Sequence, residues 1–184
     1  MSTKDIIKLG ITLMIVGVIS ATVLSVTHGI TAPIIEEQRI QEIENNMREF
    51  FSDAEEVEID EREEREFYYA YYEGERIGVA TSVAGSGYGG DIDMMVAMDM
   101  DGVIKGVSIL YHEETPGIGD VIEDESFKNN FAGISPEDAI QEEVDIITGS
   151  TQSVTGAKEG VKEGRQVLAD FLELEMPAME EVED

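Results

Sequence analysis

The feature that most limits how this chain can fold is a stretch of nineteen uncharged residues near its N-terminus, Leu9–Thr27. As a helix, this stretch would be about 28 Å long, which is close to the hydrocarbon thickness of a bilayer. A cleaved signal peptide has a shorter apolar core, of about 7–15 residues, followed by a small-residue cleavage site. The stretch is longer and no clean site of that kind follows it, so we expect residues 1–29 to be a cytoplasmic N-terminus and a retained transmembrane helix.

The charges that flank this stretch indicate how it is oriented. Lys4 and Lys8 precede it, whereas Glu36 and Glu37 begin a mostly acidic continuation. Basic residues next to a membrane helix are retained on the cytoplasmic side. We therefore expect a single-pass protein of the cell membrane, with its N-terminus in the cytoplasm and its soluble domain on the outer face.

The overall charge excludes one class of partner. The chain has 41 acidic and 12 basic residues and a net charge of −29, and a nucleic acid is bound by Lys and Arg. An acidic disordered chain and a folded domain with an acidic surface both fit this charge. The folded domain is favoured, because 42% hydrophobic residues, with six Tyr and six Phe, are enough to form a core.

The composition also limits the chemistry. The chain has no cysteine, which excludes disulfides, thiolate metal sites and a Cys nucleophile. Its two histidines, His28 and His112, are far apart, and we expect each to be structural or exposed rather than a metal ligand. No G-x-S-x-G motif is present. We therefore predict no metal site and no catalytic residue.

Apolar residues at helical spacing follow the anchor, from Thr31 and Pro33 to about Phe51. They predict an amphipathic helix whose apolar stripe packs onto its own domain, so residues 30–60 are assigned to this helix and a connection. The remaining elements are expected in residues 61–175, and residues 176–184 form an acidic tail.

The domain is predicted to be α+β, with a small antiparallel sheet and packed helices. Two hairpins are expected, over Phe67–Val83 with a Glu-Gly turn and over residues 91–112 with an Asp-Gly turn. A short helical piece is expected in residues 126–134. A longer helix is expected from about Ser153 to Leu174.

Three segments of this domain are rich in small residues: "AGSGYGGDI" (84–92), "EETPGIGD" (113–120) and the uncharged run from Ile146 to Ala157. The Pro-Gly pair of the second favours a type II turn. Glycine lets a backbone approach a ligand closely, and backbone amides bind anions. For each glycine loop, an ordinary turn remains the alternative, since neither matches a P-loop or a dinucleotide fingerprint. The residues alone predict an exported domain with a candidate anion- or cofactor-binding surface.

The succession "GYGGDI", "ETPGIG", "FKNNF" and "VDIITGST" behind one membrane helix resembles the covalent-FMN G subunit of Rnf-type electron transport complexes. It is similar, less closely, to the C subunit of the sodium-pumping NADH:quinone reductase. The resemblance runs from the anchor to about Val167. It implies a redox subunit of a translocase, which carries electrons on covalent FMN in a membrane complex that couples ferredoxin oxidation to ion translocation.

The resemblance also implies site residues. The attachment motif falls on Thr148-Gly149-Ser150-Thr151, where Thr151 would be esterified to the FMN phosphate. Ser150 stands where alanine is usual in the family, and Asp145 matches an acidic residue ahead of the motif. The isoalloxazine ring would lie along the segment made of Glu114, Thr115, Pro116, Gly117, Ile118 and Gly119.

The partners that the resemblance implies are the other membrane and redox subunits of the complex, and a flavin transferase for maturation. A transferase is needed because a threonine hydroxyl is a poor nucleophile unaided. The alternatives are a membrane-anchored ligand-binding module without redox chemistry and the C subunit of the quinone reductase. The short, single-domain length favours the Rnf subunit.

Overall fold

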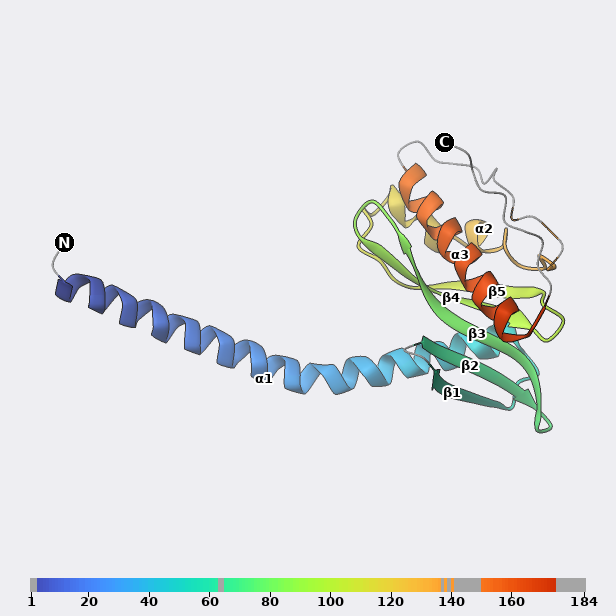
Figure 1. Ribbon diagram of the computed structural model, residues 1–184, viewed down its shortest axis with the longest axis horizontal. Coiled ribbons are helices and arrows are strands. Elements are labelled where there is room, and N and C mark those ends of the chain that lie inside the picture. Colours follow the sequence, from blue (N-terminus) through green and yellow to red (C-terminus); the bar gives the residue numbers. More distant parts are fainter. Residues whose placement is uncertain (1–2, 63–64, 137, 139, 141–149, 175–184) are drawn as a thin grey trace. The chain divides into compact units, whose positions relative to one another are not determined.

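The computed structural model describes residues 3–62, 65–136, 138, 140 and 150–174 (Figure 1). The chain divides into two compact units, Met1–Glu44 and Asn45–Asp184. The first contains most of helix α1, and the second contains the end of α1, a sheet and the remaining helices.

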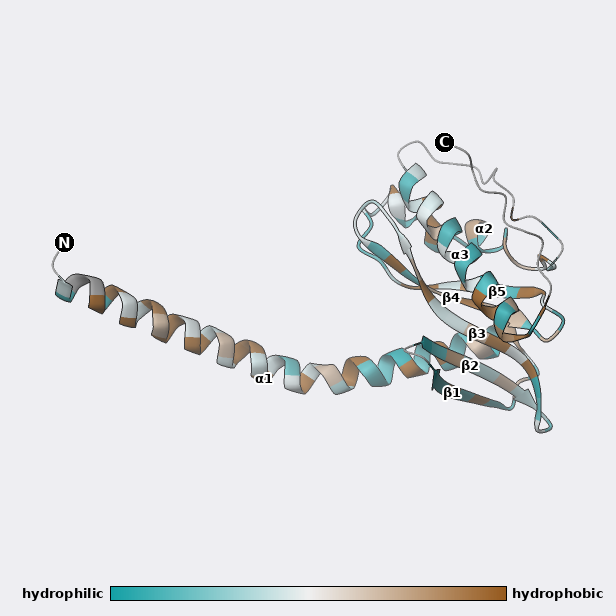
Figure 2. Ribbon diagram, in the orientation of Figure 1, coloured by the Kyte–Doolittle hydropathy of each residue, from teal (hydrophilic) through white to brown (hydrophobic). Residues whose placement is uncertain are grey.

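Helix α1 spans Thr3–Phe50 and is the one helix among the described residues that is long and apolar enough to cross a membrane. Figure 2 shows hydrophobic residues along its N-terminal part and more hydrophilic residues towards its end. Two threonines within the apolar stretch donate their hydroxyls to carbonyls one turn earlier, Thr12 to Lys8 at 2.9 Å and Thr22 to Val18 at 2.7 Å. Their polar groups are thus satisfied within the helix, as an apolar surrounding requires.

The helix continues through Pro33, where we expected a separate helix to begin. Proline cannot donate a backbone hydrogen bond to the preceding turn, but the flanking residues remain helical on both sides. The expected anchor and the expected amphipathic helix are therefore parts of a single element.

The second unit contains a five-stranded antiparallel sheet with the strand order β1-β2-β3-β4-β5. The prediction of an α+β domain with a small antiparallel sheet is confirmed. The strands are β1 (Glu56–Arg62), β2 (Arg65–Tyr72), β3 (Glu75–Ser86), β4 (Asp91–Asp99) and β5 (Ile104–Tyr111).

Both predicted hairpins are present. The β2–β3 turn has Glu73 at φ 49° and Gly74 at φ 80°, which is the left-handed pair of a type I′ turn. The β4–β5 turn has Gly102 at φ 86°.

Strand β1 was not predicted, since all but its last two residues were assigned to a connection. Its sequence, EVEIDER, is mostly charged and mostly exposed, and it forms the edge of the sheet beside β2. Charged side chains on an edge strand discourage pairing with another chain. The strand exists through its backbone bonds to β2, which hydrophobic patterning does not reveal.

Within the described residues, three helices follow the sheet: the 3₁₀ helix η1 (Gly119–Glu123), α2 (Glu125–Lys128) and α3 (Thr151–Phe171). A short helix is present where a helical piece was expected in residues 126–134, but it spans only Glu125–Lys128, and turns follow it in residues 129–133. Helix α3 begins two residues before the predicted start and lies against β3 and β4 (Figure 1).

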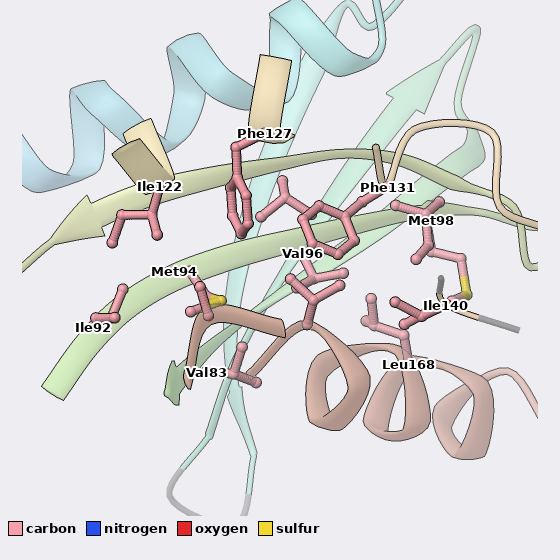
Figure 3. Close-up of a cluster of buried hydrophobic side chains, with 14 of the residues drawn as sticks. Val83, Ile92, Met94, Val96, Met98, Ile122, Phe127, Phe131, Ile140 and Leu168 are labelled. Carbon is pink, nitrogen blue, oxygen red and sulfur yellow. The ribbon is translucent and has the colours of Figure 1, made fainter. Parts of the chain in front are cut away.

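The core lies between α3 and one face of the sheet. Alternate residues of β4, from Ile92 to Met98, point into it and are fully buried, and Leu168 of α3 and Phe131 pack in the same cluster (Figure 3). The end of α1 covers the opposite face, with Phe50 over Gly106 and Phe51 over Gly78. The end of the predicted apolar stripe therefore packs on its own domain.

Candidate functional site

Three segments that are distant in the sequence meet at one end of the domain. They are the loop at residues 86–90, the segment 113–119 and the first turn of α3. Gln152 Nε2 donates to the carbonyl of Gly87 at 3.0 Å, and Ser153 Oγ donates to Glu114 Oε2 at 2.6 Å. The structure thus brings together the small-residue segments that the sequence analysis singled out.

Glycines let these segments approach each other closely. A Cβ atom at Gly85 would overlap the carbonyl oxygen of Gly156, and one at Gly156 would overlap the carbonyl oxygen of Ser86. A Cβ atom at Gly89 would overlap the carbonyl oxygen of Glu113. At these positions the glycines serve contacts within the protein, which favours the structural alternative over close approach to a ligand.

Glu114 lies inside this junction and is only 6% exposed. Its carboxylate accepts the hydroxyl of Ser153 and, at 3.0 Å, the amide of Gly89. Burial alone would raise the pKa of Glu114, but these bonds and one from the Tyr88 amide outweigh it and hold the pKa below its ordinary value. The carboxylate is therefore ionised and engaged within the protein rather than facing outward.

His112 supports the same segment from the other side. Its Nδ1 accepts the amide hydrogen of Glu114 at 3.0 Å, and its Nε2 lies 2.9 Å from Glu123 Oε1. Since Nδ1 is an acceptor, the ring proton is on Nε2 and is donated to Glu123. His112 is structural, as expected.

The turn after Glu114 has the predicted type II feature, with Gly117 at φ 77° following Pro116. The amide of Gly117 donates to both carboxylate oxygens of Asp120, at 2.8 and 2.9 Å, and the amide of Gly119 donates to Thr115 O. Residues 115–118 are exposed, whereas Gly119 is buried. The four exposed residues of this turn are themselves uncharged, the Asp120 carboxylate is bound to one of their amides, and the turn lies beside the start of α3.

Thr151 is the first residue of α3 and is exposed, whereas Ser150 before it is fully buried. The hydrogen bond from the Val154 amide to the Ser150 carbonyl is the first one along the helix. The amides of residues 151–153 therefore lie ahead of the helical hydrogen bonds and point out of the N-terminal end of α3. The first turn holds no acidic residue. The Glu114 carboxylate, which accepts the hydroxyl of Ser153, offsets part of the positive end of the helix dipole from the buried side, while the exposed side at Thr151 still presents backbone amides to an anion such as a phosphate.

Three of the candidate residues, Asp145, Thr148 and Gly149, lie outside the described residues. Of the others, Thr115, Pro116, Gly117, Ile118 and Thr151 are exposed around one junction, while Glu114, Gly119 and Ser150 are buried in it. Sequence reasoning missed the roles of Gln152 and Ser153, and of the glycines of α3. The signal for the glycines was present, since Gly156, Gly160 and Gly164 recur every four residues along one face of the helix.

Comparison with known proteins gives two family matches. The model of the FMN-binding domain matches residues 87–166, which include all of the three junction segments except Ser86. The model of the RnfG N-terminal region matches residues 1–49, which cover nearly all of α1.

Two relatives align over most of their length. The G subunit of the proton-translocating ferredoxin:NAD⁺ oxidoreductase complex of Clostridium ljungdahlii is 28% identical, over 83% of this chain and 86% of the relative. The G subunit of the Na⁺-translocating ferredoxin:NAD⁺ oxidoreductase complex of Acetobacterium woodii is also 28% identical, over 89% of this chain and 92% of the relative.

Among solved structures, the C subunit of the Na⁺-translocating NADH-quinone reductase of Parabacteroides distasonis shares the fold, with a TM-score of 0.51 and 23% identity, over 60% of this chain and 64% of that one. With a match to the RnfG N-terminal region at its start, a match to the FMN-binding domain after it and relatives of the same kind along most of its length, the chain is similar throughout to the G subunits of ion-translocating ferredoxin:NAD⁺ oxidoreductase complexes.

Proposed function

We propose that this chain is the FMN-carrying G subunit of an ion-translocating ferredoxin:NAD⁺ oxidoreductase complex, in which it transfers electrons. The family matches and the names of the relatives support this assignment. The observation that carries it is the exposed Thr151 at the start of α3, beside the exposed turn at residues 115–118. The other subunits of such a complex are its partners.

The residues at the junction fit the chemistry of FMN. Its phosphate is an anion, and the backbone amides at the start of α3 can donate to an anion next to Thr151. Its ring is flat and largely apolar, and the uncharged turn at residues 115–118 offers a surface of that kind, with Ile118 46% exposed. When bound, the flavin supplies the redox chemistry, while the chain binds and orients it.

The net charge favours a covalent link over reversible binding. At −29, the protein repels a free anionic cofactor, and on the outer face of a membrane a released cofactor would be lost by dilution. An ester between Thr151 Oγ1 and the flavin phosphate avoids this loss. A flavin transferase would transfer the flavin phosphate from a donor in which it is joined to a second phosphate group by a phosphoanhydride bond. As the ester to Thr151 forms, the threonine hydroxyl loses its proton, the anhydride bond breaks and the second phosphate group leaves.

Burial supports Thr151 over its neighbour as the attachment residue. Ser150 stands where the family usually has alanine and therefore adds a second hydroxyl to the motif. Its side chain is fully buried, whereas Thr151 is exposed. A transferase needs access to the hydroxyl, which Thr151 provides.

The covalent cofactor can be tested on the purified full chain, produced in a host that supplies the flavin transferase. We expect a yellow protein whose colour survives denaturation and whose mass exceeds that of the chain by one FMN less one water. A ligand-binding module without redox chemistry would instead be colourless, with an unmodified mass. That result would exclude the proposed function.

We also propose that the domain after α1 lies on the outer face of the membrane. Lys4 and Lys8 precede the apolar stretch, and basic residues of this kind stay in the cytoplasm. Protease added to intact spheroplasts should therefore digest the domain, while a cytoplasmic marker protein stays intact. Full protection of the domain until the membrane is permeabilised would show the reverse orientation.

A further inference from the structure

We propose that Glu114 is a positioning residue, whose buried carboxylate joins the loop 86–90, the turn 115–119 and the start of α3, and so fixes Thr151 for flavin attachment. This inference rests on the proposed function, and it assigns Glu114 a role different from contact with the flavin ring. The residue would act from behind the site, through the three segments that it holds.

The two oxygens of the carboxylate bind different segments. Oε1 accepts the amide of Gly89 at 3.0 Å, and Oε2 accepts the hydroxyl of Ser153 at 2.6 Å. Glycines enclose both oxygens: a Cβ atom at Gly87 would overlap Oε1, and one at Gly119 would lie 2.5 Å from Oε2. The whole residue is only 6% exposed, so Glu114 offers little surface on which a cofactor ring could rest.

The connection to Thr151 is short. Ser153, which Glu114 holds, is two residues further along the first turn of α3, and Gln152 ties the same turn to Gly87 at 3.0 Å. If the carboxylate is removed, the hydroxyl of Ser153 and the amide of Gly89 lose their acceptor in a buried place. Of the two contacts that tie the first turn of α3 to the rest of the junction, only the one from Gln152 to Gly87 then remains.

The chain offers variants that separate the hydrogen bonds from the charge. Glu114→Gln can keep the bonds, because its amide oxygen can accept from Gly89 and its amide nitrogen can donate to Ser153, whose hydroxyl also accepts. Glu114→Ala removes every bond of the side chain and keeps the backbone bond to His112. Glu113→Gln is the matched control, since Glu113 is adjacent but exposed, with its bond to Tyr111.

The first experiment does not depend on flavin. It measures hydrogen exchange by mass spectrometry on the full chain in detergent, produced without the transferase. Glu114→Ala should speed exchange in peptides covering residues 86–90, 115–119 and 151–156 while leaving the β2–β3 hairpin unchanged, and Glu113→Gln should match the wild type. Unchanged exchange in the three segments, or equal acceleration throughout the domain, would overturn the proposal.

The second experiment measures the rate of flavin attachment by the transferase, well below the unfolding temperature of every variant. Leu168→Ala is the control for lost stability, since Leu168 is fully buried about 25 Å along α3 from Thr151. We expect Glu114→Ala to be slowed about tenfold or more, with Glu114→Gln and Leu168→Ala close to the wild type.

The outcomes of the second experiment separate the two proposals. Equal rates in Glu114→Ala and Leu168→Ala would show that Glu114 contributes stability alone and would refute its positioning role. Failure of the wild type itself to acquire flavin would count against the proposed function, whereas the hydrogen-exchange result would still decide whether Glu114 joins the three segments.

Discussion

In the Thr151→Ala variant, we expect covalent flavin to be absent and the domain to remain folded. Thr151 is exposed at the first position of α3, so loss of its side chain leaves no cavity and costs little stability. The covalent link that we propose, in contrast, needs its hydroxyl. The measurement is flavin fluorescence of the protein band on a denaturing gel, together with the unfolding midpoint of the same preparation.

Two neighbouring variants serve as controls. Ser150→Ala should keep flavin, because it restores the residue that is usual in the family and removes a hydroxyl that is buried. Thr148→Ala should keep at least part of it. A Thr151→Ala protein that is still fluorescent, with the flavin-bearing peptide mapped to Ser150 or Thr148, would show that the attachment residue is wrongly assigned.

The parts of the fold that could be predicted from the sequence are those that short stretches determine. Nineteen uncharged residues specify a long helix, and the pairs Glu73-Gly74 and Asp101-Gly102 specify tight hairpin turns. Strand β1 could not be predicted in this way, because its charged residues carry no apolar pattern and its structure depends on the backbone of β2. The continuity of α1 through Pro33 was also missed, because proline disfavours a helix interior without excluding it.

The candidate site was predictable as a set of segments but not as an arrangement. "ETPGIG" reads as one exposed turn, yet the structure buries its first and last residues and exposes the four between them. The reason lies in Gly89 and Ser153, which bind the Glu114 carboxylate from distant parts of the chain. Such partners become visible only when the sheet and α3 have brought the segments together.

The second large effect that we expect is a loss of stability when a glycine of α3 is replaced, in the variant Gly156→Ala. Alanine is favoured over glycine in a helix by about 1 kcal/mol, so propensity alone would stabilise the variant. The new Cβ atom would, however, overlap the carbonyl oxygen of Ser86, which is backbone and cannot rotate away. We expect a net destabilisation of about 1–3 kcal/mol, as for other overpacked interiors.

Gly160→Ala, one turn further along the same helix, is the matched control. It gains the same propensity, but its Cβ atom would lie 2.9 Å from Met94 Cε and 3.0 Å from Met94 Sδ, at the end of a flexible thioether side chain. Its nearest backbone atom, Gly85 N, is 3.2 Å away, so a small shift suffices. We expect its stability to stay within about 1 kcal/mol of the wild type.

Thermal unfolding of both variants as full chains in detergent, followed by circular dichroism of the sheet domain, separates these expectations. Equal midpoints for Gly156→Ala and Gly160→Ala would contradict the close contact between α3 and the end of β3. The comparison also bears on the site, because Gly156 lies one turn from Gln152 and the contact at Ser86 adjoins the carbonyl that Gln152 binds. Because the new Cβ atom overlaps Ser86 O, Gly156→Ala should also displace the turn that carries Thr151. Flavin attachment should therefore fall together with stability in Gly156→Ala but not in Gly160→Ala.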